Sequence, residues 1–283
     1  DRENIRFMGT GFFYHHNWGV HEYDDDSLPA AGPYLITNKH VVDPRYSDSP
    51  DSLTIHVREP GDVQETTRKI IRLYDASGNP LWREHPNNPQ IDIAVVPLDF
   101  PVPHALAFHR ESVMSAGGDI SGGSVCKVIG YPDMLQDFHY LPIMRDALVS
   151  SPYSVAFHDT AYFFIDARLH DGMSGSPVIY QPPHHGLRIE SDDEELQRSL
   201  EVKGDSRIQS PRLLGIHSDE QVDVDDRVSL DDIRDQIEGP TKDPDLESYL
   251  EDIEQRVSDI ERESGLNRVW HARYLDDIIR NTN

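Results

Sequence analysis

Short β-branched runs separated by turns dominate the first 217 residues of the chain. Turns rich in Pro, Gly, Asp and Asn lie between the runs. None of the runs is followed by the long amphipathic helix that a pair of parallel strands needs as a crossover. The pattern therefore predicts an all-β fold of antiparallel strands, as barrels or as a sandwich. The expected strands are Ile5–Tyr14, Tyr34–Thr37, Leu53–Arg58, Lys69–Tyr74, Ile91–Pro97, Val125–Gly130, Tyr162–Asp166, Pro177–Tyr180 and Leu213–His217.

The residues after 228 have a helical pattern instead. Ser229 with Asp232 predicts a short helix that ends before Pro240. Apolar residues then recur at spacings of three and four, at Leu246, Leu250, Ile253, Val257 and Ile260. A third helix is expected over Leu266–Ile279. We expect this segment to pack on the chain's own strands, with a coiled coil between two copies as the alternative, and the oligomeric state stays open.

The charge of the chain argues against two kinds of binding partner. A formal net charge of −25 disfavours binding to nucleic acid or to an anionic membrane surface. No apolar run reaches the ~18 residues of a membrane span. The chain has 34 Asp against 17 Glu and 21 Arg against 5 Lys, which is the pattern expected of adaptation to high salt. Acidic loops on an ordinary protein are the alternative.

Cys126 is the only cysteine, which excludes an intrachain disulfide and favours a reducing compartment. It lies in an apolar, strand-like run, so we expect a buried and unreactive thiol. No basic and then apolar leader is visible at the start of the sequence. We therefore expect a cytoplasmic location, with secretion after removal of a signal peptide as the alternative.

Two histidine pairs invite a metal interpretation. His15-His16 and His184-His185 have no nearby cysteine or carboxylate at zinc spacing. We expect surface histidines, no metal site and no cofactor.

The stretch GMSGSP, which starts at Gly172, contains a candidate nucleophile, Ser174. A nucleophilic serine needs a general base and a group that orients the base. His40 follows an apolar strand in YLITNKHVVD, a position that holds an imidazole rigidly. Asp92 lies inside the apolar run IDIAVVPL, where a buried carboxylate needs a partner such as a histidine N–H. The alternatives are a serine in a tight turn, a structural histidine and an aspartate that faces water.

The segments GTGFFY, YLITNKHVV, IDIAVVPL, VIGYP, GMSGSPV and LLGIHS follow one another in the order of trypsin-like serine peptidases. The chain resembles most closely the bacterial and archaeal, disulfide-free branch related to the heat-shock serine proteases. The resemblance implies a chymotrypsin-like fold of two six-stranded antiparallel β-barrels with the active site between them. The expected division is a first barrel over 1–115, a second barrel over 116–228 and a C-terminal helical extension over 229–283.

The same resemblance implies a serine endopeptidase that cleaves protein or peptide substrates through an acyl-enzyme. Ser174 then attacks, His40 takes the proton and Asp92 orients the base. The backbone N–H groups of Gly172 and Ser174 match the oxyanion hole of the family. Ser176 is expected to be a packing residue.

The likeness also implies how substrate binds. Arg168 is placed near the base of the first specificity pocket, where it favours an acidic side chain or closes the pocket floor. The strand Ile216, His217 and Ser218 is expected to pair with the substrate backbone. His217 is expected to replace a residue that often helps to hold the triad carboxylate. Met173 stands where many animal members have an activating Asp, so activation by cleavage is not expected. The site is expected to be either preformed or ordered by substrate, by a regulatory domain or by a partner protein.

Two rival functions stay open. GMSGS nearly matches the elbow of the α/β-hydrolases, an esterase fold, with His217 available as base. That elbow needs a helix directly after the serine, whereas Pro177–Tyr180 is β-branched. The other rival is a catalytically silent barrel that serves as a binding or scaffold module.

Overall fold

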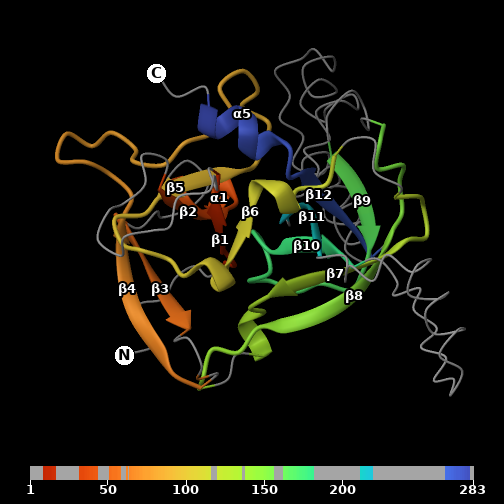
Figure 1. Cartoon of the computed structure of the whole chain (residues 1–283), viewed down its shortest axis with the longest axis horizontal. Coiled ribbons are helices and arrows are strands. Elements are labelled where there is room, and N and C mark those ends of the chain that lie inside the picture. Colours follow the sequence, from red (N-terminus) through yellow and green to blue (C-terminus); the bar gives the residue numbers. More distant parts are fainter. Residues whose placement is uncertain are drawn as a thin grey trace, which may run out of the picture.

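The computed structural model of the chain describes residues 9–16, 32–43, 51–58, 62, 64–115, 120–135, 138–155, 162–181, 211–218 and 265–280. The strands fall into two groups, one within residues 12–109 and one within residues 125–271 (Figure 1). Within the described ranges the α-helices are short: α1 (Lys39–Val42) and α5 (Tyr274–Arg280). The expected chymotrypsin-like, all-β fold is confirmed.

The second group is a closed barrel in the order β10-β11-β12-β9-β8-β7, and every pair in it is antiparallel. Along β7 and β8, more buried and more exposed residues alternate, as one inward and one outward face require, whereas six successive residues of β11 are buried. The members are β7 (Val125–Gly130), β8 (Ile143–Val149), β9 (Tyr162–Asp166), β10 (Pro177–Tyr180), β11 (Arg212–Ser218) and β12 (Leu266–His271).

The first group divides into a four-stranded sheet in the order β5-β2-β1-β6 and a two-stranded ladder of β3 and β4. Strand β6 pairs with β1 in parallel, and the other pairs are antiparallel. The members are β1 (Phe12–His15), β2 (Pro33–Thr37), β3 (Ser52–Arg58), β4 (Thr66–Arg72), β5 (Ala94–Pro97) and β6 (Ala107–His109).

The helix expected over Leu266–Ile279 is wrong in its first half. Leu266–His271 form strand β12, which pairs with β11 on one side and β9 on the other. Without β12 these two strands would leave unpaired edges, so barrel closure overrides the helical spacing of the apolar residues. Only Tyr274–Arg280 are helical, as α5. The expected helices between residues 229 and 265 lie outside the described residues.

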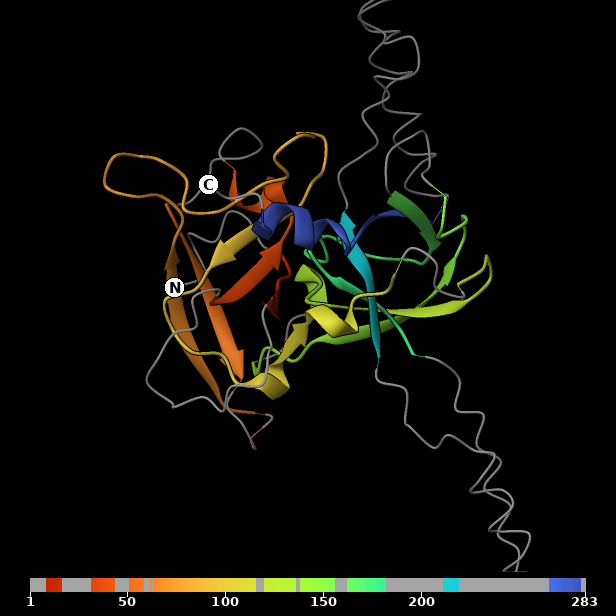
Figure 2. The same ribbon diagram turned by 45° about the horizontal axis from the view of Figure 1, so that its top comes forward.

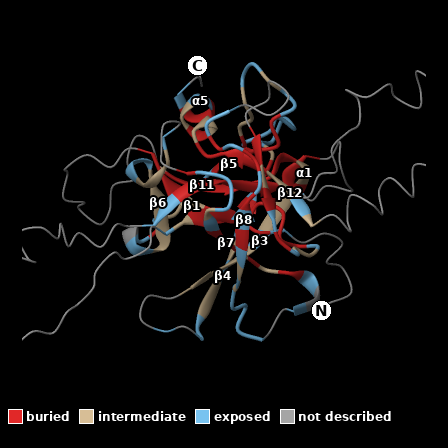
Figure 3. Ribbon diagram, turned by 90° about the vertical axis from the view of Figure 1, so that its right-hand side faces the viewer, coloured by how far each residue is buried: buried red, intermediate tan, exposed pale blue. Residues whose placement is uncertain are grey.

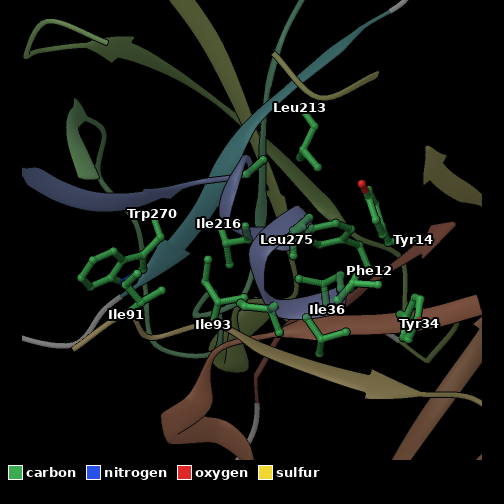
Figure 4. Close-up of a cluster of buried hydrophobic side chains, with 14 of the residues drawn as sticks. Phe12, Tyr14, Tyr34, Ile36, Ile91, Ile93, Leu213, Ile216, Trp270 and Leu275 are labelled. Atoms are coloured by element: carbon green, nitrogen blue, oxygen red, sulfur yellow. The ribbon is translucent and has the colours of Figure 1, made fainter. Parts of the chain in front are cut away.

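One apolar cluster joins the two groups. Phe12, Ile36 and Ile93 come from the first group and meet Ile216 of β11 and Leu275 of α5 (Figure 4). Buried residues accordingly concentrate at the centre of the molecule (Figure 3). Figures 1 and 2 both show α5 lying over the junction of the two groups. A shared core thus holds the two groups of strands against one another.

Two smaller expectations have different outcomes. Cys126 is buried, so the expectation of a buried thiol is confirmed, and burial raises the pKa of that thiol to about 12. His15 and His16 are also buried, so the expectation of surface histidines is wrong for this pair. The Nε2 of His15 lies 3.2 Å from the carbonyl oxygen of Val102, whereas Nδ1 of His16 lies 3.4 Å from Asp276. His184-His185 lies outside the described residues.

No helix of the described ranges is both long enough and apolar enough to cross a membrane.

Candidate active site

His40 and Asp92 form a tightly bonded pair in the first group. His40 lies in the single turn of α1, directly after β2. Its Nδ1 is 2.7 Å from Oδ2 of Asp92, and its backbone N–H donates to Oδ1 at 3.0 Å. The side-chain amide of Asn38 holds the backbone carbonyl of Asp92 at 2.7 Å. These bonds make Nδ1 the protonated ring nitrogen of the neutral imidazole and leave Nε2 as the basic one.

Ser218 supplies a further hydrogen bond to the same carboxylate. Its hydroxyl donates to Oδ2 of Asp92 at 2.7 Å, from the end of β11 in the second barrel. Asp92 is only 1% exposed, so these donors offset the desolvation of a buried charge. This contact corrects the interpretation of His217, because Ser218 is the residue that holds the carboxylate. The sequence did single out Ser218, but for substrate binding.

Ser174, the candidate nucleophile, lies in a turn before β10, formed by residues 171–176, which we call the nucleophile turn. Two glycines in it, Gly172 and Gly175, both have φ of +88°, in the left-handed region that favours glycine. A Cβ on Gly172 would overlap Oδ1 of Asp133, and a Cβ on Gly175 would overlap the carbonyl oxygen of Thr10. Both glycines are therefore required by backbone conformation and by close packing.

Some backbone N–H groups of the nucleophile turn donate hydrogen bonds to backbone carbonyls, and others do not. Met173 donates to the carbonyl of His170 at 3.1 Å, and Ser176 donates to that of Met173 at 3.0 Å. Gly175 donates to the carbonyl of His217 at 2.9 Å. Among the described residues, no backbone carbonyl accepts from the N–H of Gly172 or of Ser174. Two N–H groups on either side of Met173 are thus left for another acceptor.

Thr10 connects the nucleophile turn to the first group, and sequence reasoning gave it no role. Its backbone N–H donates to the carbonyl of Ser174 at 2.8 Å, and its hydroxyl donates to that of Gly172 at 2.8 Å. Its own carbonyl accepts from the hydroxyl of Thr37, three residues before His40, at 2.8 Å. Thr10 could have been noticed in the sequence, because it lies in the quoted segment GTGFFY. It precedes Gly11, a position at which the structure leaves little room for a side chain.

Ser176 is fully buried and packs against Gly130, where a Cβ would overlap its hydroxyl. Its full burial and its contact with Gly130 are what we expect of a packing residue. Asp133 places a carboxylate against the nucleophile turn, because its Oδ1 lies beside Gly172. Partial burial, and then the charge of Asp171, raise the pKa of Asp133 above its usual range.

The residues expected to bind substrate lie in different surroundings. Arg168 follows β9 with an exposed side chain, and its carbonyl accepts from Arg145 at 2.8 Å. Ile216 is buried in the cluster between the two groups. His217 is buried as well, and its backbone N–H and C=O are already bonded to Ser176 and Gly175. Ser218 ends β11 beside Asp92.

The chain is similar to known proteins in sequence and in structure. A family model described as a trypsin-like peptidase domain matches residues 9–181. No curated protein matches the sequence. Among solved structures, the HtrA-type protease AlgW with a tripeptide is similar at 18% identity and a TM-score of 0.37, over 67% of this chain and 44% of AlgW.

Two further structures are similar at the same level. One is a serine endoprotease from Yersinia pestis, at 14% identity and a TM-score of 0.35, over 77% of this chain and 50% of that one. The other is the MamO protease domain from Magnetospirillum magneticum, at 16% identity and a TM-score of 0.37, over 74% of this chain and 83% of that one. The chain thus spans half or less of the length of AlgW and of the Yersinia pestis protein.

Proposed function

Because the chain belongs to the trypsin-like peptidase domain family, whose model matches residues 9–181, we propose that it is a serine endopeptidase with His40, Asp92 and Ser174 as its catalytic triad. The observation that carries the proposal is the set of bonds around Asp92. The carboxylate accepts from the backbone and ring of His40 and from the hydroxyl of Ser218. That arrangement fixes the ring orientation and leaves Nε2 as the base.

The proposed reaction has two halves. In acylation, Nε2 of His40 takes the hydroxyl proton of Ser174 as Oγ attacks the carbonyl carbon of the scissile peptide. The peptide C–N bond then breaks, and His40 returns the proton to the leaving amine. In deacylation, His40 takes a proton from water, which attacks the acyl-enzyme and releases the acid and Ser174.

The oxyanion of each half is proposed to be bound by the N–H groups of Gly172 and Ser174. The hydrogen bonds of the nucleophile turn support this proposal. Met173, Gly175 and Ser176 donate to backbone carbonyls, whereas no described backbone carbonyl accepts from Gly172 or Ser174. Loss of one such donor typically lowers the rate by ~10²–10³. The substrate backbone is proposed to pair at the Ser218 end of β11, since the backbone of His217 is already engaged.

For Arg168 two proposals stay open: it favours an acidic side chain of the substrate, or it closes the floor of the specificity pocket. A regulatory domain or partner protein is the proposed alternative to a preformed site. The exposed guanidinium of Arg168 is compatible with access by a substrate carboxylate.

The test is a digestion of a proteome-derived peptide library, read as new termini by mass spectrometry. The endopeptidase proposal expects internal cleavages by the wild-type protein and none by Ser174→Ala. Ser151→Ala is the matched control, because Ser151 is a buried serine whose hydroxyl accepts from Phe164 in the second barrel. Absence of internal cleavage by a folded wild-type protein would contradict the proposal and favour the silent binding module.

A further inference from the structure

His217 lies behind the nucleophile turn, inside the second barrel. It belongs to β11, which pairs with β10 on one edge and β12 on the other, and its side chain is fully buried. The preceding residue, Ile216, points into the cluster between the two groups (Figure 4). Because successive side chains leave a strand on opposite faces, the ring of His217 points away from that cluster.

His217 holds the nucleophile turn on both sides of Ser174. Its backbone N–H donates to the carbonyl of Ser176 at 2.9 Å, and its carbonyl accepts from Gly175 at 2.9 Å. Its ring Nδ1 lies 3.0 Å from the carbonyl oxygen of Met173. The residue before the nucleophile and the residues after it are therefore all bonded to His217.

The other ring nitrogen faces a side chain of fixed orientation. Nε2 of His217 lies 3.3 Å from Oδ1 of Asn267 on β12. The amide nitrogen of Asn267 donates to the carbonyls of Ala167 at 2.6 Å and Gly265 at 2.8 Å. Exchanging the amide oxygen and nitrogen would set an oxygen against two carbonyl oxygens, so Oδ1 must face the ring.

Both ring nitrogens therefore face oxygens that only accept hydrogen bonds. A neutral imidazole carries one N–H and would leave its other nitrogen lone pair against one of these oxygens, whereas the imidazolium carries two. From this geometry we infer that His217 is an imidazolium in the folded protein and acts as a positioning residue that holds the nucleophile turn. The inference rests on the proposed function in that the turn carries Ser174.

The surroundings of His217 carry charges of both signs. The elements packed around it bear the ionisable residues Arg268, His271, Asp166, His170, Asp171 and Asp92. The last of these bonds to Ser218, the next residue on β11. The net charge of −25 favours a buried cation over a buried anion. The hold on the turn is present while the ring is charged and is lost as rising pH removes its second proton.

The direct test reads the protons on the ring. The Ser174→Ala protein is labelled with ¹⁵N-histidine, and NMR spectra are recorded across a pH series. The signals of His217 are those absent from the Ser174→Ala, His217→Gln protein. We expect both ring nitrogens to carry protons at pH 7 and to keep them to a higher pH than exposed histidines do. A single protonated nitrogen at pH 7 would overturn the inference.

The second test measures how the labelling rate of Ser174 by a fluorophosphonate depends on pH. Wild-type protein is expected to show a rise as His40 deprotonates and a fall at higher pH as His217 deprotonates. Asn267→Ala is expected to lose the alkaline fall, because the ring then needs only the N–H that faces Met173. Asn79→Ala, an exposed asparagine that bonds to Asp75, is the control and should keep the fall. An unchanged alkaline fall in Asn267→Ala would contradict the inference.

His217→Gln is expected to label about tenfold more slowly than wild type at pH 7, since one donor to a buried acceptor is lost. The two proposals fail separately. If wild-type protein is labelled at Ser174 and the ring is neutral, only the inference fails. If no variant is labelled, the proposed function fails, and the NMR spectra still decide the charge of His217.

Discussion

At the scale of single residues, Asp92 is the centre of the site, and Ser218 is its contact from the other half of the chain. The hydroxyl of Ser218 is buried and donates to Oδ2 at 2.7 Å. Hydrogen bonds to a charged group contribute more than those between neutral groups, about 1.5–3 kcal/mol. We therefore expect position 218 to influence the proposed catalysis through the carboxylate of Asp92.

We expect Ser218→Ala to lower the rate of fluorophosphonate labelling by about tenfold or more, because the carboxylate then orients His40 with one donor fewer. Labelling is followed by intact mass at fixed pH. Ser151→Ala loses a buried serine hydroxyl far from Asp92 in the hydrogen-bond network and is the matched control. Equal labelling rates in the two variants would contradict a role for Ser218.

Asp133 gives the second prediction at this scale. Its raised pKa means that the folded protein holds this proton more tightly than the unfolded chain does. Its contribution to stability is therefore present at low pH and is lost as the pH rises from the unfolded value through the folded one. Asp133→Asn should make the free energy of unfolding less dependent on pH in the acidic range, measured by urea denaturation.

The same substitution removes a negative charge beside the proposed oxyanion donor Gly172. Since Asp133 is largely exposed and screened, we expect labelling at neutral pH to rise by no more than about fivefold. A slower reaction of Asp133→Asn would show that the carboxylate supports the turn rather than opposing the oxyanion.

At the scale of structural elements, two glycines with positive φ differ in how closely they are packed: Gly175 lies in the nucleophile turn, and Gly78 lies in another turn. Gly175 and Gly78 have similar positive φ values, +88° and +81°. A Cβ on Gly175 would overlap the carbonyl oxygen of Thr10, whereas a Cβ on Gly78 would have nothing within 4 Å. The pair separates backbone strain from close packing.

Gly78→Ala is expected to lower the free energy of unfolding by about 1 kcal/mol through strain alone. Gly175→Ala is expected to cost a further ~1–3 kcal/mol, because the backbone of Thr10 must move. Urea denaturation gives the two values, and fluorophosphonate labelling should be lost only in Gly175→Ala. Equal losses of stability would contradict the packing between Thr10 and the turn.

The sequence predicted the elements whose signal is local. Strands such as Val125–Gly130 and Pro177–Tyr180 match the observed β7 and β10, since β-branched runs between turns carry that signal themselves. Strand β12 was missed because its conformation is decided by pairing with β9 and β11, far away in the sequence. Strands β6 and β8 had no strong local signal. The proposed division at residues 115 and 228 stays a prediction, and β12 shows that the second barrel draws on residues beyond it.

The residues of the candidate site also divide into those that a local sequence pattern indicates and those that it does not. His40, Asp92 and Ser174 could be singled out because each lies in a short recognisable segment; the first two are bonded, and the catalytic role of all three stays a prediction. Ser218, Thr10 and Asn267 act through hydrogen bonds between segments distant in sequence, which a local pattern does not report.

At the scale of the whole molecule, the charge of −25 is the dominant property. Repulsion among carboxylates destabilises the compact state and weakens as salt screens it. The cytoplasmic location and the adaptation to high salt stay predictions.

If the composition reflects salt adaptation, we expect the melting temperature to rise by about 5 °C or more between 0.1 M and 3 M KCl, equivalent to about 2 kcal/mol. Differential scanning fluorimetry measures the rise. A sorbitol series of equal osmolality is the control for effects that do not depend on charge. A melting temperature that is flat in KCl, or that rises equally in sorbitol, would contradict salt adaptation.

The central claim is that His40 and Asp92 make Ser174 a nucleophile. The most direct measurement is reaction of the wild-type protein, Ser174→Ala and Ser176→Ala with a fluorophosphonate, with the adduct located by peptide mass spectrometry. Ser176 lies two residues away with a buried hydroxyl, so its variant controls for the turn itself. We expect a single adduct at Ser174 in wild-type protein and in Ser176→Ala, and none in Ser174→Ala. An unlabelled but folded wild-type protein, or an adduct that persists in Ser174→Ala, would contradict the account.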